Sequence, residues 1–279
     1  MKNPTDKVAP TAEYALGHSD RELERLGTQA RLLEPITREF FIDAGIVPGM
    51  RILDVGCGGG DVAFLAADLA GDKGSVGGVD RAPAAIVTAR RRAEARSLRN
   101  VSFREGDPAE MIFEESFDAV VGRYVLLFQA DAAHMLRQLA RHLQPGGLIV
   151  FHEPDWSAVR SFPPVPTYDR CCRWIVEAGI LGGSNWNMAD KLHAAFLAAG
   201  LPAPTMHMKT FVGGGTRAGE WLRAVAEIAA TLLPAMEKFG VATAAEVDLA
   251  TLAERMSQEV AQNNSVIFWR SEIGAWSPL

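Results

Sequence analysis

Leu53-Asp54-Val55-Gly56-Cys57-Gly58-Gly59-Gly60-Asp61 is the stretch that decides the fold. It begins as a short apolar segment of the β-strand type and reaches its glycines just before a segment with helical spacing. The glycines let the backbone turn sharply and approach a ligand closely. Free amides at the start of the following helix favour an anionic group. The stretch therefore predicts a strand, a tight turn and a helix, with a ligand bound at the turn.

Strands and helices alternate on both sides of this stretch. Strands are expected at 51–55, 75–80, 101–105, 117–122 and 147–152, and helices at 60–71, 83–97 and 131–143. Short apolar strands separated by helices predict a parallel sheet that is covered on both faces. The fold class is therefore α/β, and the sheet is expected to be doubly wound.

Three acidic residues follow the first three predicted strands, namely Asp61, Asp80 and Asp107. The carboxyl ends of parallel strands border the crevice in which open α/β sheets bind ligands. An acid after the second strand can accept hydrogen bonds from a ribose diol, and one after the third from an adenine amino group. Asp61 stands where the dinucleotide fingerprint needs a third glycine, counted from Gly56. It would repel a pyrophosphate but suits an ammonium group.

Composition narrows the class of protein. The 279 residues are 48% hydrophobic and carry a net charge of −6, which disfavours nucleic acid and anionic membranes as partners. The arginines between residues 90 and 99 are expected to form a solvated helix face. The three cysteines give neither a disulfide framework nor a zinc signature, so no metal is expected. No leader or membrane-spanning stretch is seen, and a cytoplasmic protein is expected.

These motifs resemble the class I S-adenosylmethionine-dependent methyltransferases, over roughly residues 48–155. The matching motifs are Leu53–Gly60, Gly78-Val79-Asp80, Gly106-Asp107, Phe117–Val121 with Leu126-Leu127-Phe128, and Leu143–Gly147. The resemblance implies a Rossmann-like, seven-stranded, mostly parallel sheet with an antiparallel last strand. Its two further strands are expected at 205–212 and 265–270. S-adenosylmethionine is the cofactor that the resemblance implies.

The domain organisation follows from the same resemblance. Residues 1–46 are expected to form an N-terminal helical arm, in which Pro35 interrupts the helix. Residues 47–216 and 263–279 would form the Rossmann-like domain. Residues 217–262 would be a helical insertion that acts as a lid.

The resemblance also assigns cofactor contacts. Asp54, Gly56, Cys57, Gly58, Gly60 and Asp61 would hold the methionine end, Asp80 the ribose, and Arg81, Asp107, Pro108 and Ala109 the adenine end. Arg123, just past the fourth strand, is placed near the carboxylate or the acceptor. The arm of related quinone-biosynthesis methyltransferases closes over the cofactor, so Tyr14, Arg25 and Gln29 are further candidates.

Catalytic candidates are few, because the enzyme mainly aligns a nucleophile with an activated methyl group. A base helps when the nucleophile carries a proton. His152, Glu153 and Asp155 follow the fifth strand at the mouth of the crevice, and His18 precedes the first helix. A neutral imidazole suits this task near pH 7. His152, His18 and Glu153 are therefore the catalytic candidates.

The acceptor is expected to be a small molecule. The sequence Gly122-Arg123-Tyr124-Val125 after the fourth strand lacks the motifs of adenine, cytosine and metal-dependent catechol methyltransferases. The aromatic region 153–187 and the helices at 217–262 suit a flat or hydrophobic metabolite. Whether O, N or C is methylated stays open, as does a homodimer. The alternatives are a cofactor-binding protein without transfer activity and a nicotinamide-dependent oxidoreductase.

Overall fold

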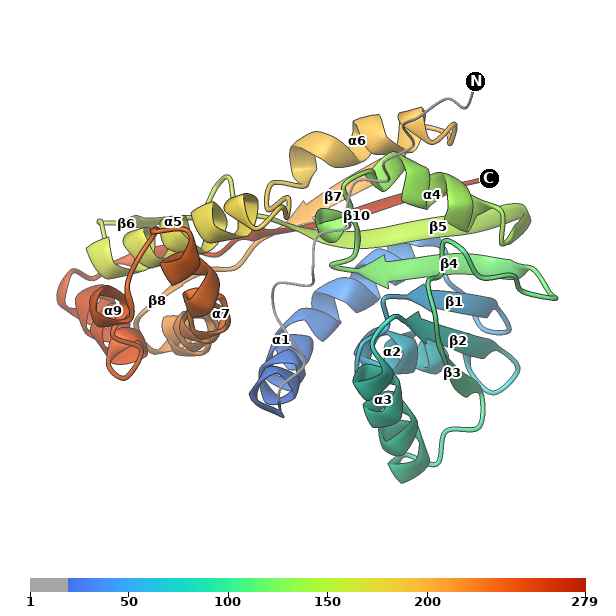
Figure 1. Cartoon of the computed structure of the whole chain (residues 1–279), viewed down its shortest axis with the longest axis horizontal. Coiled ribbons are helices and arrows are strands. Elements are labelled where there is room, and N and C mark those ends of the chain that lie inside the picture. Colours follow the sequence, from blue (N-terminus) through green and yellow to red (C-terminus); the bar gives the residue numbers. More distant parts are fainter. Residues whose placement is uncertain (1–19) are drawn as a thin grey trace, which may run out of the picture.

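A seven-stranded sheet forms the centre of the computed structural model, which describes residues 20–279 and side chains from residue 31 onward (Figure 1). Its strand order is β3-β2-β1-β4-β5-β10-β7. The strands are β1 (Arg51–Val55), β2 (Ser75–Asp80), β3 (Val101–Glu105), β4 (Phe117–Arg123), β5 (Leu143–Asp155), β7 (Thr205–Lys209) and β10 (Ser271–Pro278). β1 to β5 are parallel, and β10 is antiparallel to both β5 and β7. The expected doubly wound α/β class is confirmed.

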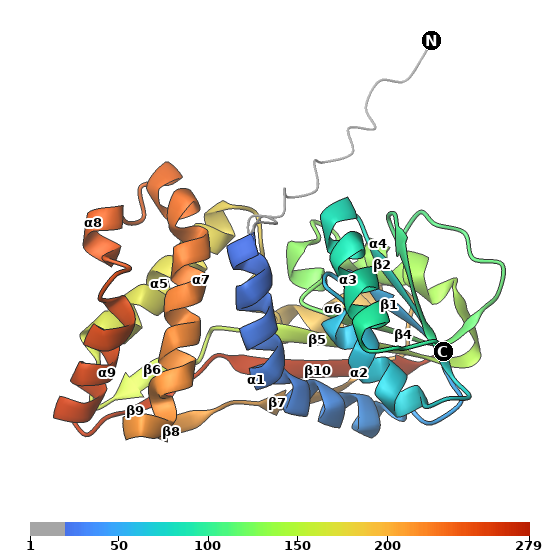
Figure 2. The ribbon, with the colours of Figure 1, turned by 90° about the horizontal axis from the view of Figure 1, so that it is seen from below.

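Helices cover both faces of this sheet, as the apolar strands require (Figures 1 and 2). One face carries α1 (Asp20–Ala44), α2 (Asp61–Ala70) and α3 (Pro83–Ala95). The other face carries η1 (Leu126–Phe128), α4 (Ala132–Ala140) and α6 (Ala189–Ala198). The central strand β1 is buried from Ile52 to Val55. The glycine turn after β1 is thus fixed by a strand that is packed on both sides.

A second lobe stands beside the sheet domain. Its small antiparallel sheet has the order β6-β9-β8, from β6 (Arg160–Phe162), β9 (Val266–Phe268) and β8 (Val212–Gly214). Its helices are α5 (Pro166–Leu181), η2 (Gly215–Ala218), α7 (Gly219–Lys238), α8 (Ala244–Val247) and α9 (Leu252–Gln262). Figure 2 shows α1 lying between α7 and the helices of the sheet domain. α1 therefore borders both lobes.

Of the positions expected for the last two strands, 205–212 is confirmed in part and 265–270 is wrong. Residues 205–212 divide between β7 in the main sheet and β8 in the small one, and 265–270 contains β9 of the small sheet. The last strand of the main sheet is β10, which follows directly. It was missed because its buried residues include Ser271, Glu272 and Ser277, so it lacks an apolar pattern.

α1 runs through Pro35 without the expected interruption. Proline removes one helix hydrogen bond but keeps a helical φ. Around it Leu33, Phe40 and Phe41 are buried, and this packing offsets the loss. Among residues 20–279, no helix combines the length and the apolar character needed to cross a membrane.

Candidate active site

The glycine turn after β1 leaves open space on its outer side. Gly56, Gly58 and Gly60 all have positive φ, which disfavours any other residue there. A Cβ atom on Gly56 would lie 2.9 Å from Val125, so the turn packs closely against the segment after β4. A Cβ atom on Gly58 would meet nothing within 4 Å. The turn therefore presents bare backbone to a ligand over Gly58.

Asp80 ties the glycine turn to the end of β2. Its Oδ2 accepts the Gly58 amide at 2.8 Å, and its Oδ1 accepts the Ala82 amide at 2.9 Å. A carboxylate has about four acceptor positions, so each oxygen can still accept another donor. The structure thus places the predicted ribose acid directly beside the predicted methionine-binding turn.

Arg92 of α3 also contacts the glycine turn. It forms an ion pair with Asp61 at 2.5 Å and donates to the Gly59 carbonyl at 2.6 Å. Arg90 donates to the Phe103 carbonyl at 2.7 Å. Arg91, Arg96 and Arg99 are exposed, as expected of a solvated helix face, whereas Arg92 also holds the turn. Asp61 already has a cationic partner, so its role toward an ammonium group stays a prediction.

Asp54 is a buried acid without a hydrogen bond of ordinary geometry, although the backbone amide of Ala63 is close enough to lower its pKa. Its side chain is 1% exposed, and neither carboxylate oxygen has a hydrogen-bond partner among the described residues. Burial raises the pKa of this carboxyl group well above its usual value, while the nearby charge of Arg123 acts in the opposite direction. A buried acid without a partner is costly, and a cationic ligand would remove that cost. Asp54 therefore fits the ammonium group of an amino acid.

The residues predicted for the adenine end also come together. Arg81 and Asp107 form an ion pair, and the Ala109 amide donates to Asp107 at 3.0 Å. The Pro108 carbonyl lies 3.2 Å from His142 Nε2. These groups lie after β2 and β3, at the edge of the crevice. Their contact with an adenine ring stays a prediction.

Cys57 is buried in the turn, and its amide donates to the Val79 carbonyl at 3.0 Å. Burial raises the pKa of its thiol, so the thiolate is strongly disfavoured. Its Sγ lies 3.1 Å from where a Cβ atom on Gly78 would be. The side chain packs against β2, and only its backbone is available to a cofactor.

His152 belongs to a buried polar network. Its Nδ1 lies 3.0 Å from Thr37 Oγ1 of α1, and its Nε2 lies 3.0 Å from Glu272 Oε2 of β10. Arg123 donates to Thr37 Oγ1 at 3.1 Å. Burial lowers the pKa of His152, so the ring is neutral near pH 7. Because the ring is fully buried, it can exchange a proton only through these partners.

Glu272 is the centre of this network. It accepts hydrogen bonds from Tyr124 Oη at 2.6 Å, Arg270 Nε at 3.0 Å and Trp269 Nε1 at 3.4 Å, besides the His152 contact. Burial alone would raise the pKa of Glu272, but Arg270, His152 and Tyr124 outweigh it and the pKa is lowered. Glu272 is therefore ionised, and His152 donates its Nε2 proton to it.

The sheet register explains how these side chains meet. Arg123, His152 and Gly274 are neighbours in one row across β4, β5 and β10. A Cβ atom on Gly274 would lie 2.6 Å from the Phe40 ring, so glycine lets α1 approach this row. Tyr124 follows Arg123 with a φ of +59°, an unfavourable conformation for a bulky residue. Strain of this kind gathers at functional sites.

Glu153 and Asp155 hold loops by their side chains. Glu153 accepts the backbone amides of Val125, Leu126 and Leu127 at 2.8 to 3.2 Å. Asp155 accepts the amides of Ser157 and Ala189. The catalytic role of Glu153 stays a prediction, while these bonds give it a structural role in the segment that packs on the glycine turn.

Replacing Glu153 by alanine is expected to destabilise the fold by about 3 kcal/mol or more, because three buried amides lose their acceptor. Burial raises the pKa of Glu153 to about 8, from 4.5. The folded protein therefore binds this proton more tightly than the unfolded chain, and the contribution of Glu153 to stability falls as the pH rises from about 4.5 to 8. Urea unfolding across that range measures both effects. The exposed Glu114→Ala variant is the control, and an equally small loss in both variants would contradict the structural role.

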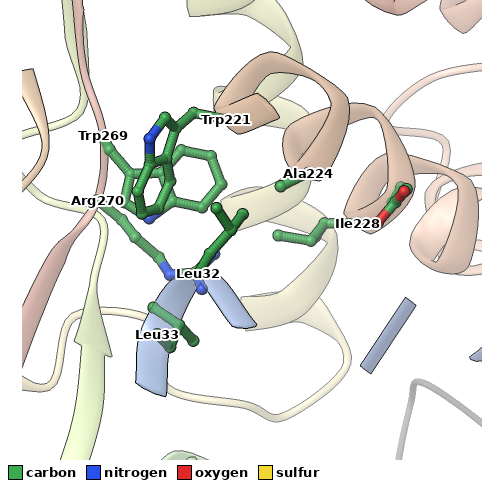
Figure 3. A pocket seen from close by; sticks show the side chains of 8 residues that line it. Leu32, Leu33, Trp221, Ala224, Ile228, Trp269 and Arg270 are labelled. Carbon is green, nitrogen blue, oxygen red and sulfur yellow. The ribbon is translucent and has the colours of Figure 1, made fainter. Parts of the chain in front are cut away.

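A pocket opens between α1, α7 and the segment before β10 (Figure 3). It is an open surface hollow with a cavity volume of about 10 Å³, within about 250 Å³ of space that includes bulk solvent. Its lining residues are Leu32, Leu33, Trp221, Ala224, Glu227, Ile228, Trp269 and Arg270. The rings of Trp221 and Trp269 lie 5.0 Å apart, and Trp221 stacks on Phe211. The walls are mostly apolar and aromatic, with Glu227 of α7 as an acidic lining residue, and the polar network reaches the pocket through Arg270.

Part of the predicted site cannot be placed. Tyr14 and His18 lie outside the described residues. The backbone of Arg25 and Gln29 belongs to α1, but their side chains are outside the described part. Their roles stay predictions.

Several site residues were not found from the sequence. They are Thr37, Arg92, Tyr124, Trp221, Trp269, Arg270 and Glu272. Only the spacing of Arg270 and Glu272, two residues apart at the start of β10, offered a signal.

The sequence matches the family described as a methyltransferase domain over residues 46–187. It is 38% identical to aklanonic acid methyltransferase DauC of Streptomyces sp. strain C5, over 54% of this chain and 68% of that protein. It is also 38% identical to the 2-phytyl-1,4-naphtoquinone methyltransferase of Synechococcus elongatus, over 47% of this chain and 57% of that protein.

Among solved structures, the fold resembles phospholethanolamine N-methyltransferase 2 of Haemonchus contortus. The TM-score is 0.57 at 17% identity, covering 100% of this chain and 62% of that one. At this identity the likeness concerns the fold alone.

Proposed function

Because the chain belongs to the methyltransferase-domain family, of the class I S-adenosylmethionine-dependent kind, we propose that it methylates a flat small-molecule acceptor held between α1 and α7. The observation that carries the proposal is the unpaired, buried carboxylate of Asp54 beneath the glycine turn. A buried acid without a hydrogen-bond partner favours a cationic ligand beside it.

The chain's own groups provide for each part of the cofactor. Asp54 would bind the ammonium group, and the guanidinium of Arg123, close enough to alter the Asp54 pKa, would bind the carboxylate. The free acceptor positions of Asp80 would bind the ribose hydroxyls. Arg81, Asp107 and the backbone near it would border the adenine. When bound, S-adenosylmethionine supplies a methyl group already activated on a sulfonium sulfur.

The pocket supplies the acceptor's surroundings. Trp221, Trp269 and the aliphatic side chains of α1 and α7 favour a flat, apolar body. Two relatives are named for aklanonic acid and for a naphthoquinone as acceptors, which supports a ring system of this kind.

The remaining catalytic requirement is alignment, with a base where the acceptor carries a proton. His152, His18 and Glu153 stay candidates for that base. His152 is the one that the structure connects to the pocket, through Glu272 and Arg270. The atom that is methylated, and a homodimer, are left open.

Filling the pocket tests the placement of the acceptor. Ala224 is buried and lines the pocket, so Ala224→Leu is expected to reduce methyl transfer at least tenfold while leaving cofactor affinity unchanged. Methyl transfer is measured with labelled S-adenosylmethionine and hydroxylated naphthoquinones as acceptors. Cofactor affinity is measured by calorimetry. Ala194→Leu on the exposed face of α6 is the matched control. Full activity of the folded Ala224→Leu variant would place the acceptor elsewhere.

A further inference from the structure

The pocket has a cationic side chain among its lining residues. Of the lining residues in the described part of the chain, Arg270 is the one cation and Glu227 of α7 the one acid, and Arg270 is only 2% exposed. Figure 3 shows this side chain reaching from the segment before β10 toward α1, beside the rings of Trp221 and Trp269. A nearly buried guanidinium at the end of an apolar pocket is a specific feature, since charged side chains are rarely buried without a purpose.

Arg270 is held rigidly but keeps donors to spare. Its Nε donates to Glu272 at 3.0 Å, and its Nη2 donates to Tyr124 Oη at 2.8 Å. The Trp269 ring lies 4.6 Å from the guanidinium carbon and the Trp156 ring 5.3 Å from it. A guanidinium has five N–H donors, and no bond from Nη1 to another residue is found in the part of the chain with described side chains. Nη1 is therefore available to an occupant of the pocket.

We propose that Arg270 selects acceptors that carry an ionised oxygen, such as an enolate, phenolate or carboxylate, on the edge of a flat ring system. This inference rests on the proposed function, because it concerns the molecule in the same pocket. The rings of Trp221 and Trp269 hold the apolar body, and Nη1 meets the oxygen. An arginine remains charged at any physiological pH, so it recognises the anion without a change in its own protonation.

Glu272 and Tyr124 are positioning residues in this proposal. They accept the bonds from Nε and Nη2 of the guanidinium and so leave Nη1 as the nitrogen that can donate to a ligand. Arg270 and Glu272 form a close ion pair whose net charge is zero. The anionic oxygen of the acceptor would therefore bind to a neutral pair and not to an isolated cation. Recognition therefore depends on a directed hydrogen bond more than on long-range attraction.

The test compares two probes with the same ring system. 2-Hydroxy-1,4-naphthoquinone is an anion at neutral pH, whereas 2-methoxy-1,4-naphthoquinone is uncharged. Binding to the full chain saturated with S-adenosylhomocysteine is followed by quenching of tryptophan fluorescence, and Trp221→Phe identifies the signal from the pocket. The wild type is expected to bind the anion at least tenfold more tightly than the methoxy compound.

Variants of Arg270 test whether this side chain causes the preference for the anionic probe. Arg270→Gln is expected to reduce the ratio of the two affinities to about one, with little change for the methoxy probe. Arg270→Gln combined with Glu272→Gln should do the same while leaving no buried charge unpaired, so it keeps the test open if the single variant unfolds. Arg217→Gln, on the surface of η2, is the control and should keep the preference.

The outcomes separate the two proposals. No preference in the wild type, or an unchanged preference in both Arg270 variants, overturns the role of Arg270 even if S-adenosylhomocysteine binds normally. Binding of S-adenosylhomocysteine with no binding of either probe also overturns it, and leaves the cofactor assignment intact. Failure to bind S-adenosylhomocysteine as well would remove the proposed function itself.

Discussion

Replacing Asp80 by alanine is expected to weaken S-adenosylhomocysteine binding by a hundredfold or more. Asp80 is the acceptor for the Gly58 amide at 2.8 Å and for the Ala82 amide at 2.9 Å. Its loss removes the hydrogen bonds that hold the glycine turn, together with the proposed acceptor for the ribose hydroxyls. Hydrogen bonds to a charged group are worth about 1.5–3 kcal/mol each, so losing two bonds from the ribose hydroxyls to Asp80 suffices for this effect.

Calorimetric titration of the purified variant measures the loss. Asp80→Asn keeps one acceptor oxygen and is expected to fall between the variant and the wild type. Asp72→Ala changes an exposed acid just before the same strand and should bind normally. Wild-type affinity in a folded Asp80→Ala protein would contradict the placement of the cofactor.

Replacing Glu272 by glutamine is expected to destabilise the fold by about 3–5 kcal/mol, because it leaves the buried Arg270 charge without a counter-charge. The double variant with Arg270→Gln removes both charges and should lose less than the single change. The loss in the double variant, minus the losses in Glu272→Gln and in Arg270→Gln measured separately, gives the coupling between the two side chains. A double-variant loss equal to the sum of the two single losses would mean that the pair is not coupled.

The same pair predicts an acid-sensitive stability. The pKa of Glu272 is lowered in the folded protein, so its contribution is present above the unfolded value of about 4.5 and is lost as the pH falls through the folded value. In Glu272→Gln this part of the pH dependence should be absent. Urea unfolding of both proteins between about pH 3 and 7 measures it.

The sequence was most informative where function depends on local spacing. The glycine turn and the acids after β1, β2 and β3 lie within short, regular strand–turn–helix units, so their meeting at one edge of the sheet follows from topology. The structure places Gly58 beside Asp80, and Arg81 beside Asp107, as this reasoning requires.

The acceptor side depends on contacts that no local pattern reveals. His152 meets Thr37 and Glu272 across separations of 115 and 120 residues. β10 was hidden by its buried polar residues, and without that strand neither Glu272 nor Arg270 could be assigned to the site. The tryptophans of the pocket come from α7 and from the segment before β10, which the sequence places in different units.

Cofactor binding by the unmodified protein tests the central claim most directly. The purified chain is titrated calorimetrically with S-adenosylmethionine and S-adenosylhomocysteine, with NAD as the control ligand. Saturable binding of the first two at one site per chain, and none of NAD, is the expected result. Binding of NAD, or of none of the three, would contradict the assignment of Asp54, Asp80 and the glycine turn to S-adenosylmethionine.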